Sequence, residues 1–135
     1  TLAWVGPKTI AAHIKPRLFE AAAKAGRGEP RILATLPICV TDNERSIRDL
    51  ISKNLAFYAT LPSYKAMFVR EGIRAPGDLA LVGSAAKVED GLEALAAAGV
   101  SDYAASAFTT NKVEASATAD LLHKKLTDWG PRDDR

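Results

Sequence analysis

Arg31–Val40, Arg-Ile-Leu-Ala-Thr-Leu-Pro-Ile-Cys-Val, decides the fold class of this 135-residue chain. The run is apolar almost throughout rather than alternating, which is typical of a strand covered on both faces, as in a parallel sheet. Pro37 has no N–H group to donate, so we expect a bulge or a local break in pairing there. The run predicts an α/β fold with a parallel sheet and helices outside it.

Thr1–Thr9, Thr-Leu-Ala-Trp-Val-Gly-Pro-Lys-Thr, precedes it as a second apolar, β-prone run that turns directly into a helix. Gly6 permits a sharp turn, and Pro7 suits the first helical position. The free N–H groups of such a helix start form an anion site, although an ordinary strand-to-helix connection has the same sequence pattern. A strand on the first residue also suggests that the chain is a piece of a longer one.

The first helix is predicted over Lys8–Gly26. Its apolar residues recur four apart and form one stripe. Pro16 removes a backbone hydrogen bond, so we expect a kink or a division into two shorter helices. The stripe consists of Ile10, Ile14, Leu18 and Ala22.

Two helices are predicted after Arg31–Val40. The first begins at a capping box, Thr41–Glu44, and runs to about Thr60, and the second begins at Leu61–Ser63 and ends at Gly72. They carry a group of large apolar side chains that line a substrate mouth, form a subunit contact or, as the simplest interpretation, make a local core. This group is Tyr58, Tyr64, Met67 and Phe68.

The last third of the chain alternates again. A short apolar segment, Leu79–Val82, leads to a cap at Ser84 and a helix over Ala85–Ala98. Ser101–Phe108 is a third strand with small side chains, which leave room for a helix or another group. Thr109 or Thr110 is predicted to cap a last helix, and Gly130–Arg135 reads as a frayed tail. The inward-facing residues of that helix are predicted to be Val113, Ala117, Leu121, Leu122 and Leu126.

Three strands cannot close a parallel sheet and leave two apolar edges, so the pattern predicts a slice of a larger α/β fold, either an open sheet or a barrel. Hydrophobic residues make up 47% and charged residues 25%, ordinary values for a globular domain. No apolar run spans a bilayer, and the net charge of +2 comes from interspersed residues, which argues against membrane and nucleic-acid partners.

Few residues suggest chemistry by themselves. The single cysteine, Cys39, excludes an internal disulfide, agrees with a cytoplasmic location and reads as a small buried hydrophobe. His13 and His123 have no ligand-spaced partners, so no metal site is predicted.

The order of several motifs resembles the bacterial luciferase-like flavin and deazaflavin oxidoreductases. Thr1–Thr9 is similar to their strand and Gly-Pro-[Lys/Arg]-Thr turn. The further segments look like the carboxy-terminal half of the branch that uses coenzyme F-420. They are Pro7–Leu18, Leu36–Asp42, Tyr58–Met67, Leu79–Gly83 and Ala98–Tyr103.

The resemblance implies a (β/α)8 TIM barrel of which this chain, as a single fragment, holds about strands six to eight with their helices. Such a barrel takes about 250 residues. The family transfers hydride between coenzyme F-420, or FMN in the nearest alternative, and a small organic substrate. The hydride-transfer centre would lie largely outside this fragment, which alone is expected to be inactive. The residues carried over as cofactor-binding are Trp4, Val5, Gly6 and Lys8.

The partners implied are the N-terminal half of the same barrel, a small-molecule substrate and further copies in a homo-oligomer. Relatives often carry a hydroxyl where this chain has Trp4-Val5, which puts a direct phosphate contact from that position in question. An alternative from another class is a non-catalytic α/β binding or structural module that completes its sheet by oligomerising.

Overall fold

The computed structural model describes residues 1–129, so the predicted tail over Gly130–Arg135 lies outside the described residues. Strands and helices alternate along the chain, as predicted, with short irregular helical turns between them. The elements are β1 (Leu2–Ala3), α1 (Pro7–Thr9), η1 (Ile10–Ile14), α2 (Lys15–Lys24), β2 (Leu33–Val40), α3 (Glu44–Asn54), η2 (Tyr58–Thr60), α4 (Pro62–Glu71), η3 (Pro76–Leu79), β3 (Leu81–Gly83), α5 (Ala85–Ala97), β4 (Asp102–Ala107) and α6 (Lys112–Trp129).

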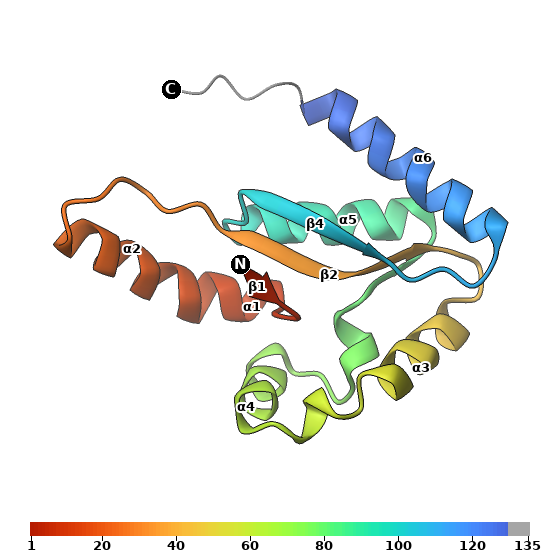
Figure 1. Cartoon of the computed structure of the whole chain (residues 1–135), viewed down its shortest axis with the longest axis horizontal. Coiled ribbons are helices and arrows are strands. Elements are labelled where there is room, and N and C mark those ends of the chain that lie inside the picture. Colours follow the sequence, from red (N-terminus) through yellow and green to blue (C-terminus); the bar gives the residue numbers. More distant parts are fainter. Residues whose placement is uncertain (130–135) are drawn as a thin grey trace.

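β2 is the centre of a parallel sheet, and β1, β3 and β4 all pair with it (Figure 1). The Thr35 carbonyl accepts from the N–H of Trp4, directly after β1, and the Thr41 N–H donates to the Gly83 carbonyl of β3. The Ile38 carbonyl accepts from Phe108 after β4. β1 and β3 therefore follow one another along one edge of β2, and β4 occupies the other edge. The predicted parallel sheet is confirmed, and the described residues form no closed barrel.

The sheet has one strand more than the three that we predicted. Leu79–Val82 was expected only as a short apolar segment, and its second half belongs to β3, Leu81–Gly83, which pairs with Ile38–Val40. A three-residue strand is too short for apolar periodicity to identify, so only its pairing with β2 reveals it.

Pro37 interrupts pairing on one edge of β2 only. Its register with Ser106 of β4 continues without a break. Since N–H groups alternate between the two edges, the nitrogen of Pro37 faces the edge shared by β1 and β3. There it falls after the pairing of Thr35 with β1 and before the pairing of Ile38 with β3. The predicted break is therefore present, at a point where no donor is needed.

Helices cover one face of β2 along its length. Ala34 and Leu36 are buried in one cluster with Ile10, Phe68 of α4 and Leu95 of α5. α5 lies behind β2 and β4 in Figure 1. The core predicted from the long apolar run is therefore present on this face.

The opposite face is covered mainly at its carboxyl end. Cys39 packs there with Ile47 and Ile51 of α3. Across the middle, the register aligns Ala3, Thr35 and Ala104, of which the two alanines are exposed and Thr35 is half-buried. The exposed side chains of Ala3 and Ala104 are therefore not covered by a helix in the described part of the chain.

Arg48 of α3 is hydrogen-bonded to the backbone of the segment that contains β3. Its guanidinium donates to the carbonyls of Gly77, Ala80 and Val82 at 2.7, 3.0 and 3.0 Å. The N–H of Gly77 donates to Ser52 Oγ at 3.0 Å. This close approach leaves no room for a side chain at position 77, where a Cβ would collide with the Arg48 carbonyl and lie 2.6 Å from Ser52 Oγ.

Gly77→Ala is expected to lower the free energy of unfolding by about 2 kcal/mol, because the backbone of α3 must move to admit a methyl group. Gly28→Ala is the matched control, since no atom lies within 4 Å of a Cβ at that exposed glycine. Chemical denaturation of both variants measures the difference. Equal stabilities for the two variants would contradict the close packing of α3 on the β3 segment.

The first helix is divided just before Pro16 into two α-helical segments, which is one of the two predicted outcomes. α1 and α2 are joined by η1, a π-helical turn in which the Lys15 N–H donates to the Ile10 carbonyl. One wider turn accommodates the proline. The predicted stripe is buried only at Ile10, and Leu18 is exposed, because α2 extends away from the sheet.

α6 turns a different face to the sheet from the one predicted. Leu121 is buried as expected, but Val113 and Leu126 are 78% and 71% exposed, and Glu114 and Thr118 are buried in their place. Polar pairing sets this rotation: Thr118 Oγ1 accepts from the Val40 N–H at 2.9 Å.

The helix caps differ from those predicted at three of four positions. Ser84 does cap α5, with its Oγ accepting from the Lys87 N–H at 3.4 Å. α6 is capped by Asn111, whose Oδ1 accepts from the Glu114 N–H at 2.9 Å, rather than by Thr109 or Thr110. α3 begins at Glu44 without the predicted capping box, and α4 follows Leu61 without a side-chain cap.

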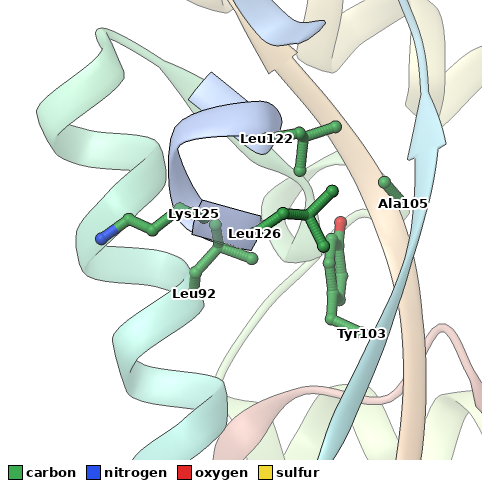
Figure 2. A pocket seen from close by; sticks show the side chains of 6 residues that line it. All are labelled: Leu92, Tyr103, Ala105, Leu122, Lys125 and Leu126. Carbon is green, nitrogen blue, oxygen red and sulfur yellow. The ribbon is translucent and has the colours of Figure 1, made fainter. Parts of the chain in front are cut away.

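An apolar groove lies between α6, α5 and β4. Figure 2 shows Tyr103 and Leu126 facing each other across it. Its volume is about 190 Å³, and its lining residues are Leu92, Tyr103, Ala105, Leu122, Lys125 and Leu126. Beside it β4 pairs only with β2 among the described residues, so its outer edge is open. Within residues 1–129 no helix has both the length and the apolar character to cross a bilayer.

Candidate functional site

The strands all run parallel to β2, so their carboxyl ends point in one direction, but they do not end level: β3 ends beside Val40, β4 beside Ile38 and β1 beside Thr35. In parallel α/β folds, ligands bind at the carboxyl ends of the strands. The four residues predicted to bind a cofactor follow β1, whose carboxyl end lies beside the middle of β2. Their side chains, however, take three different directions.

Trp4 is the most unusual residue of the four. It has φ = 62° and is the described non-glycine residue with a positive φ. For a bulky side chain this left-handed conformation costs about 1–3 kcal/mol and persists only where the surroundings impose it. Its N–H donates to the Thr35 carbonyl at 3.0 Å, and its ring packs against the cluster around Cys39.

Trp4 belongs to a group of four aromatic rings, which we call the aromatic platform: Trp4, Phe57, Tyr58 and Tyr64. Trp4 and Tyr58 are nearly parallel, with ring centroids 6.2 Å apart. Phe57 and Tyr64 meet Tyr58 edge-on at 6.1 and 5.5 Å. Tyr64 Oη donates to the Ala3 carbonyl at 3.4 Å, and burial raises the pKa of this phenol.

The aromatic group predicted from the sequence is therefore divided in two. Met67 and Phe68 are buried in the core, as the simplest interpretation expected. Tyr58, by contrast, is 39% exposed and its neighbour Phe57 is 69% exposed. The link between this exposed pair and Trp4, more than fifty residues earlier, is not visible in the sequence.

The start of α1 is held by Glu71, the last residue of α4. Its carboxylate accepts from the N–H of Thr9 at 2.6 Å and from the N–H of Lys8 at 3.3 Å. Lys8 Nζ donates to the Glu71 carbonyl at 3.1 Å. A Cβ at Gly6 would collide with the Glu71 carboxyl, so the glycine is required for this approach.

Two donors of the predicted anion site are thus occupied by a carboxylate of the chain itself. Glu71 is 6% exposed, and the negative charge complements the helix start. Val5 packs against the core and Gly6 is buried, whereas Trp4 is half-buried and Lys8 is exposed. Sequence reasoning missed Glu71, because a contact across 62 residues has no local signature.

Glu71→Gln is expected to lower the free energy of unfolding by about 2 kcal/mol, since it removes a buried charge that accepts two backbone N–H groups. Glu20→Gln is the control, because Glu20 is exposed and pairs only with Lys24 within its own helix, at 2.6 Å. That exposed pair contributes little. Thermal unfolding of both variants tests the contact, and a Glu71→Gln protein as stable as the control would contradict it.

Lys8 also lines a cleft of about 340 Å³ between α1, α4 and α5. Its floor is apolar, with Leu36 and Leu95, and its rim includes Arg48 and Lys87 as well as Glu71 and Asp78. Arg48 and Lys87 are both paired with Glu44, at 2.8 and 2.7 Å. The exposed Lys8 ammonium, whose bond goes to a backbone carbonyl, keeps its charge available to a ligand.

A second polar arrangement fixes the carboxyl end of β2. The buried carboxylate of Glu114 accepts from Thr41 Oγ1 at 2.8 Å and from the Thr110 N–H and hydroxyl at 2.7 and 2.8 Å. The hydrogen bond from the Thr110 backbone, foremost, lowers the pKa of Glu114 below its ordinary value of 4.5. This carboxylate is satisfied by the protein and joins α6 to the end of β2.

Replacement of Glu114 tests this arrangement through pH. A lowered folded-state pKa means that the stabilisation is complete above pH 4.5 and is lost as the pH falls through the folded-state value. Glu114→Gln should therefore cost about 2 kcal/mol at pH 7 and progressively less in acid. Asp120→Asn, at an exposed position of the same helix, is the control. A cost that is independent of pH between 7 and 3 would refute the assignment.

The remaining reactive side chains show no arrangement for catalysis. Burial raises the pKa of Cys39 to about 11, which keeps the thiol protonated and inert. His13 Nε2 accepts a 2.7 Å hydrogen bond from Arg17 Nη1 on the surface of the first helix. Among residues 1–129 no three His, Cys, Asp or Glu side chains are grouped in a way that could hold a metal ion.

Comparison with known proteins adds no identity. No family model matches the chain, and no curated protein matches it.

Proposed function

We propose that the chain is the carboxy-terminal part of a luciferase-like (β/α)8 oxidoreductase that transfers hydride between coenzyme F-420 and a small organic substrate. The observation that carries the proposal is the position of Trp4 and Lys8. Both follow the carboxyl end of β1, a strand of the parallel sheet, and neither side chain is fully buried. Parallel α/β enzymes place their active sites at the carboxyl ends of their strands.

The order of the strands supports the barrel. β1, β2 and β4 are neighbours in that order, with helices between them in the sequence, as three successive strands of a barrel would be. The outer edge of β4 is open among the described residues, and small side chains face away from the helices on β1 and β4. The N-terminal half of the barrel would add its strands at these edges.

The site residues fit the cofactor in part. F-420 carries a phosphate and an acidic tail, and the Lys8 ammonium at the rim of the cleft offers it a charge. The buried hydroxyl of Thr9 has no hydrogen-bond partner within the described residues, which leaves a polar atom for a ligand or a water molecule. The backbone N–H groups of Lys8 and Thr9 already donate to Glu71, so side chains would make the contact with the cofactor. When bound, the cofactor supplies the hydride-carrying ring.

Titration of the full-length gene product with F-420, and separately with FMN, tests the proposal. We expect saturable binding of F-420, and Lys8→Ala is expected to raise its Kd about threefold at low ionic strength and less at high salt. Lys24→Ala is the control, because Lys24 is an exposed cation on the same helical stretch and pairs with Glu20. Fluorescence of the deazaflavin measures the binding.

Each outcome decides between stated alternatives. Binding of FMN but not F-420 would replace the cofactor and keep the oxidoreductase class. Binding of neither would overturn the enzyme proposal in favour of a non-catalytic α/β module. An unchanged Kd in Lys8→Ala would remove this side chain from the site, and the mass of the full-length protein in solution would show whether it is a homo-oligomer.

A further inference from the structure

We propose that the aromatic platform is the wall on which the organic substrate binds, and that the substrate presents an uncharged, planar aromatic or conjugated ring. The inference rests on the proposed function, since it assigns the substrate class of that same site. Trp4 connects the two: it is one of the residues placed at the site, and its ring is stacked on Tyr58.

Exposure is the first argument. The segment around α4 buries Met67 and Phe68 completely enough to serve as core, yet it leaves Phe57 69% and Tyr58 39% exposed. Aromatic rings contribute more than other side chains when buried, so an exposed group of them beside the carboxyl end of β1 indicates a binding surface. In this segment, Met67 and Phe68 pack in the core, whereas Phe57 and Tyr58 are exposed to solvent.

Backbone strain at Trp4 is the second argument. A residue of this size at φ = 62° pays a conformational cost that glycine would avoid. Two contacts impose the conformation: the hydrogen bond from its N–H to Thr35 and the stacking of its ring on Tyr58. The strained conformation thus places the indole ring of Trp4 against the exposed ring of Tyr58. A flat ligand would stack on an aromatic ring in the same way.

The segment that carries three of the four rings has no charged side chain, and this favours an uncharged ligand. The ten residues from Leu55 to Tyr64 include no Asp, Glu, Lys or Arg. Tyr64 donates its hydroxyl to the Ala3 carbonyl, and burial raises the pKa of this phenol further above the ordinary pH range. A charged ligand would find no opposite charge in this segment. A neutral ring gains stacking on the aromatic faces and leaves no charge unpaired.

The test uses three probes and two variants of the full-length protein. 2-Naphthol is the neutral planar probe, decahydro-2-naphthol is its saturated counterpart, and 2-naphthylmethylammonium is its cationic counterpart. Ligand-observed NMR gives the Kd of each. We expect 2-naphthol to bind at least threefold more tightly than the other two, and Tyr58→Ala to weaken 2-naphthol about three- to tenfold.

Val69→Ala is the matched control, because Val69 is an exposed apolar residue of α4 that lies outside the platform. Phe57→Ala serves as the second variant if Tyr58→Ala fails to fold, since the exposed Phe57 ring contributes little to the core. Equal affinity for the saturated probe, preference for the cation, or equal weakening by Val69→Ala would each overturn the proposal. The proposal would also be overturned if 2-naphthol does not bind and Phe57→Ala changes the oligomeric state. That result would identify the platform as a contact between proteins.

Two failures remain distinguishable. If F-420 and FMN do not bind but 2-naphthol does, with loss in Tyr58→Ala, the redox function fails and the ring site stands by itself. If F-420 binds normally and displaces 2-naphthol, the platform holds the cofactor ring, and the substrate assignment fails while the enzyme proposal stands.

Discussion

Every other strand of the described sheet is hydrogen-bonded to β2, so the fold depends on the pairing of this one strand. Its apolar side chains are buried on the helical face by α5 and the first helix, and at the carboxyl end of the opposite face by α3. Its two edges accept three partners, because β1 and β3 divide one edge between them. Pro37 lies between these two pairings, and it has no N–H group that would need a partner strand. Pro37 is therefore compatible with a central strand only because its nitrogen faces the gap between β1 and β3.

The parallel sheet and most of the helices could be predicted because they depend on local patterns. The apolar run of β2, the pair Ile47 and Ile51 in α3 and the Ser84 cap are all recognisable within a few residues. The face of α6 was not predictable from apolar spacing, because Glu114 and Thr118 are buried to satisfy groups at the end of β2. Hydrogen bonds over more than seventy residues determine this orientation, and no periodicity records them.

The same limit applies to the candidate site. The sequence located the carboxyl end of β1 and the residues Trp4 and Lys8, since a strand followed by Gly-Pro and a helix is a local pattern. It could not show that Glu71 occupies the helix start or that Tyr58 lies against Trp4, since both contacts join segments far apart. As a result, the backbone N–H groups of Lys8 and Thr9 are bound by Glu71, whereas the Lys8 side chain is exposed and Trp4 is half-buried.

Two surfaces of the described chain expose apolar groups, and their chemistry differs. The groove beside α6 is lined by aliphatic side chains, Tyr103 and the stem of Lys125, next to the open edge of β4. Aliphatic contacts beside an unpaired strand suit another polypeptide, which can continue the sheet and fill the groove together. The aromatic platform has no strand edge of its own and instead combines flat rings with a strained backbone at Trp4. Since flat rings favour flat ligands, the platform is the surface whose chemistry matches the planar ring proposed as its ligand.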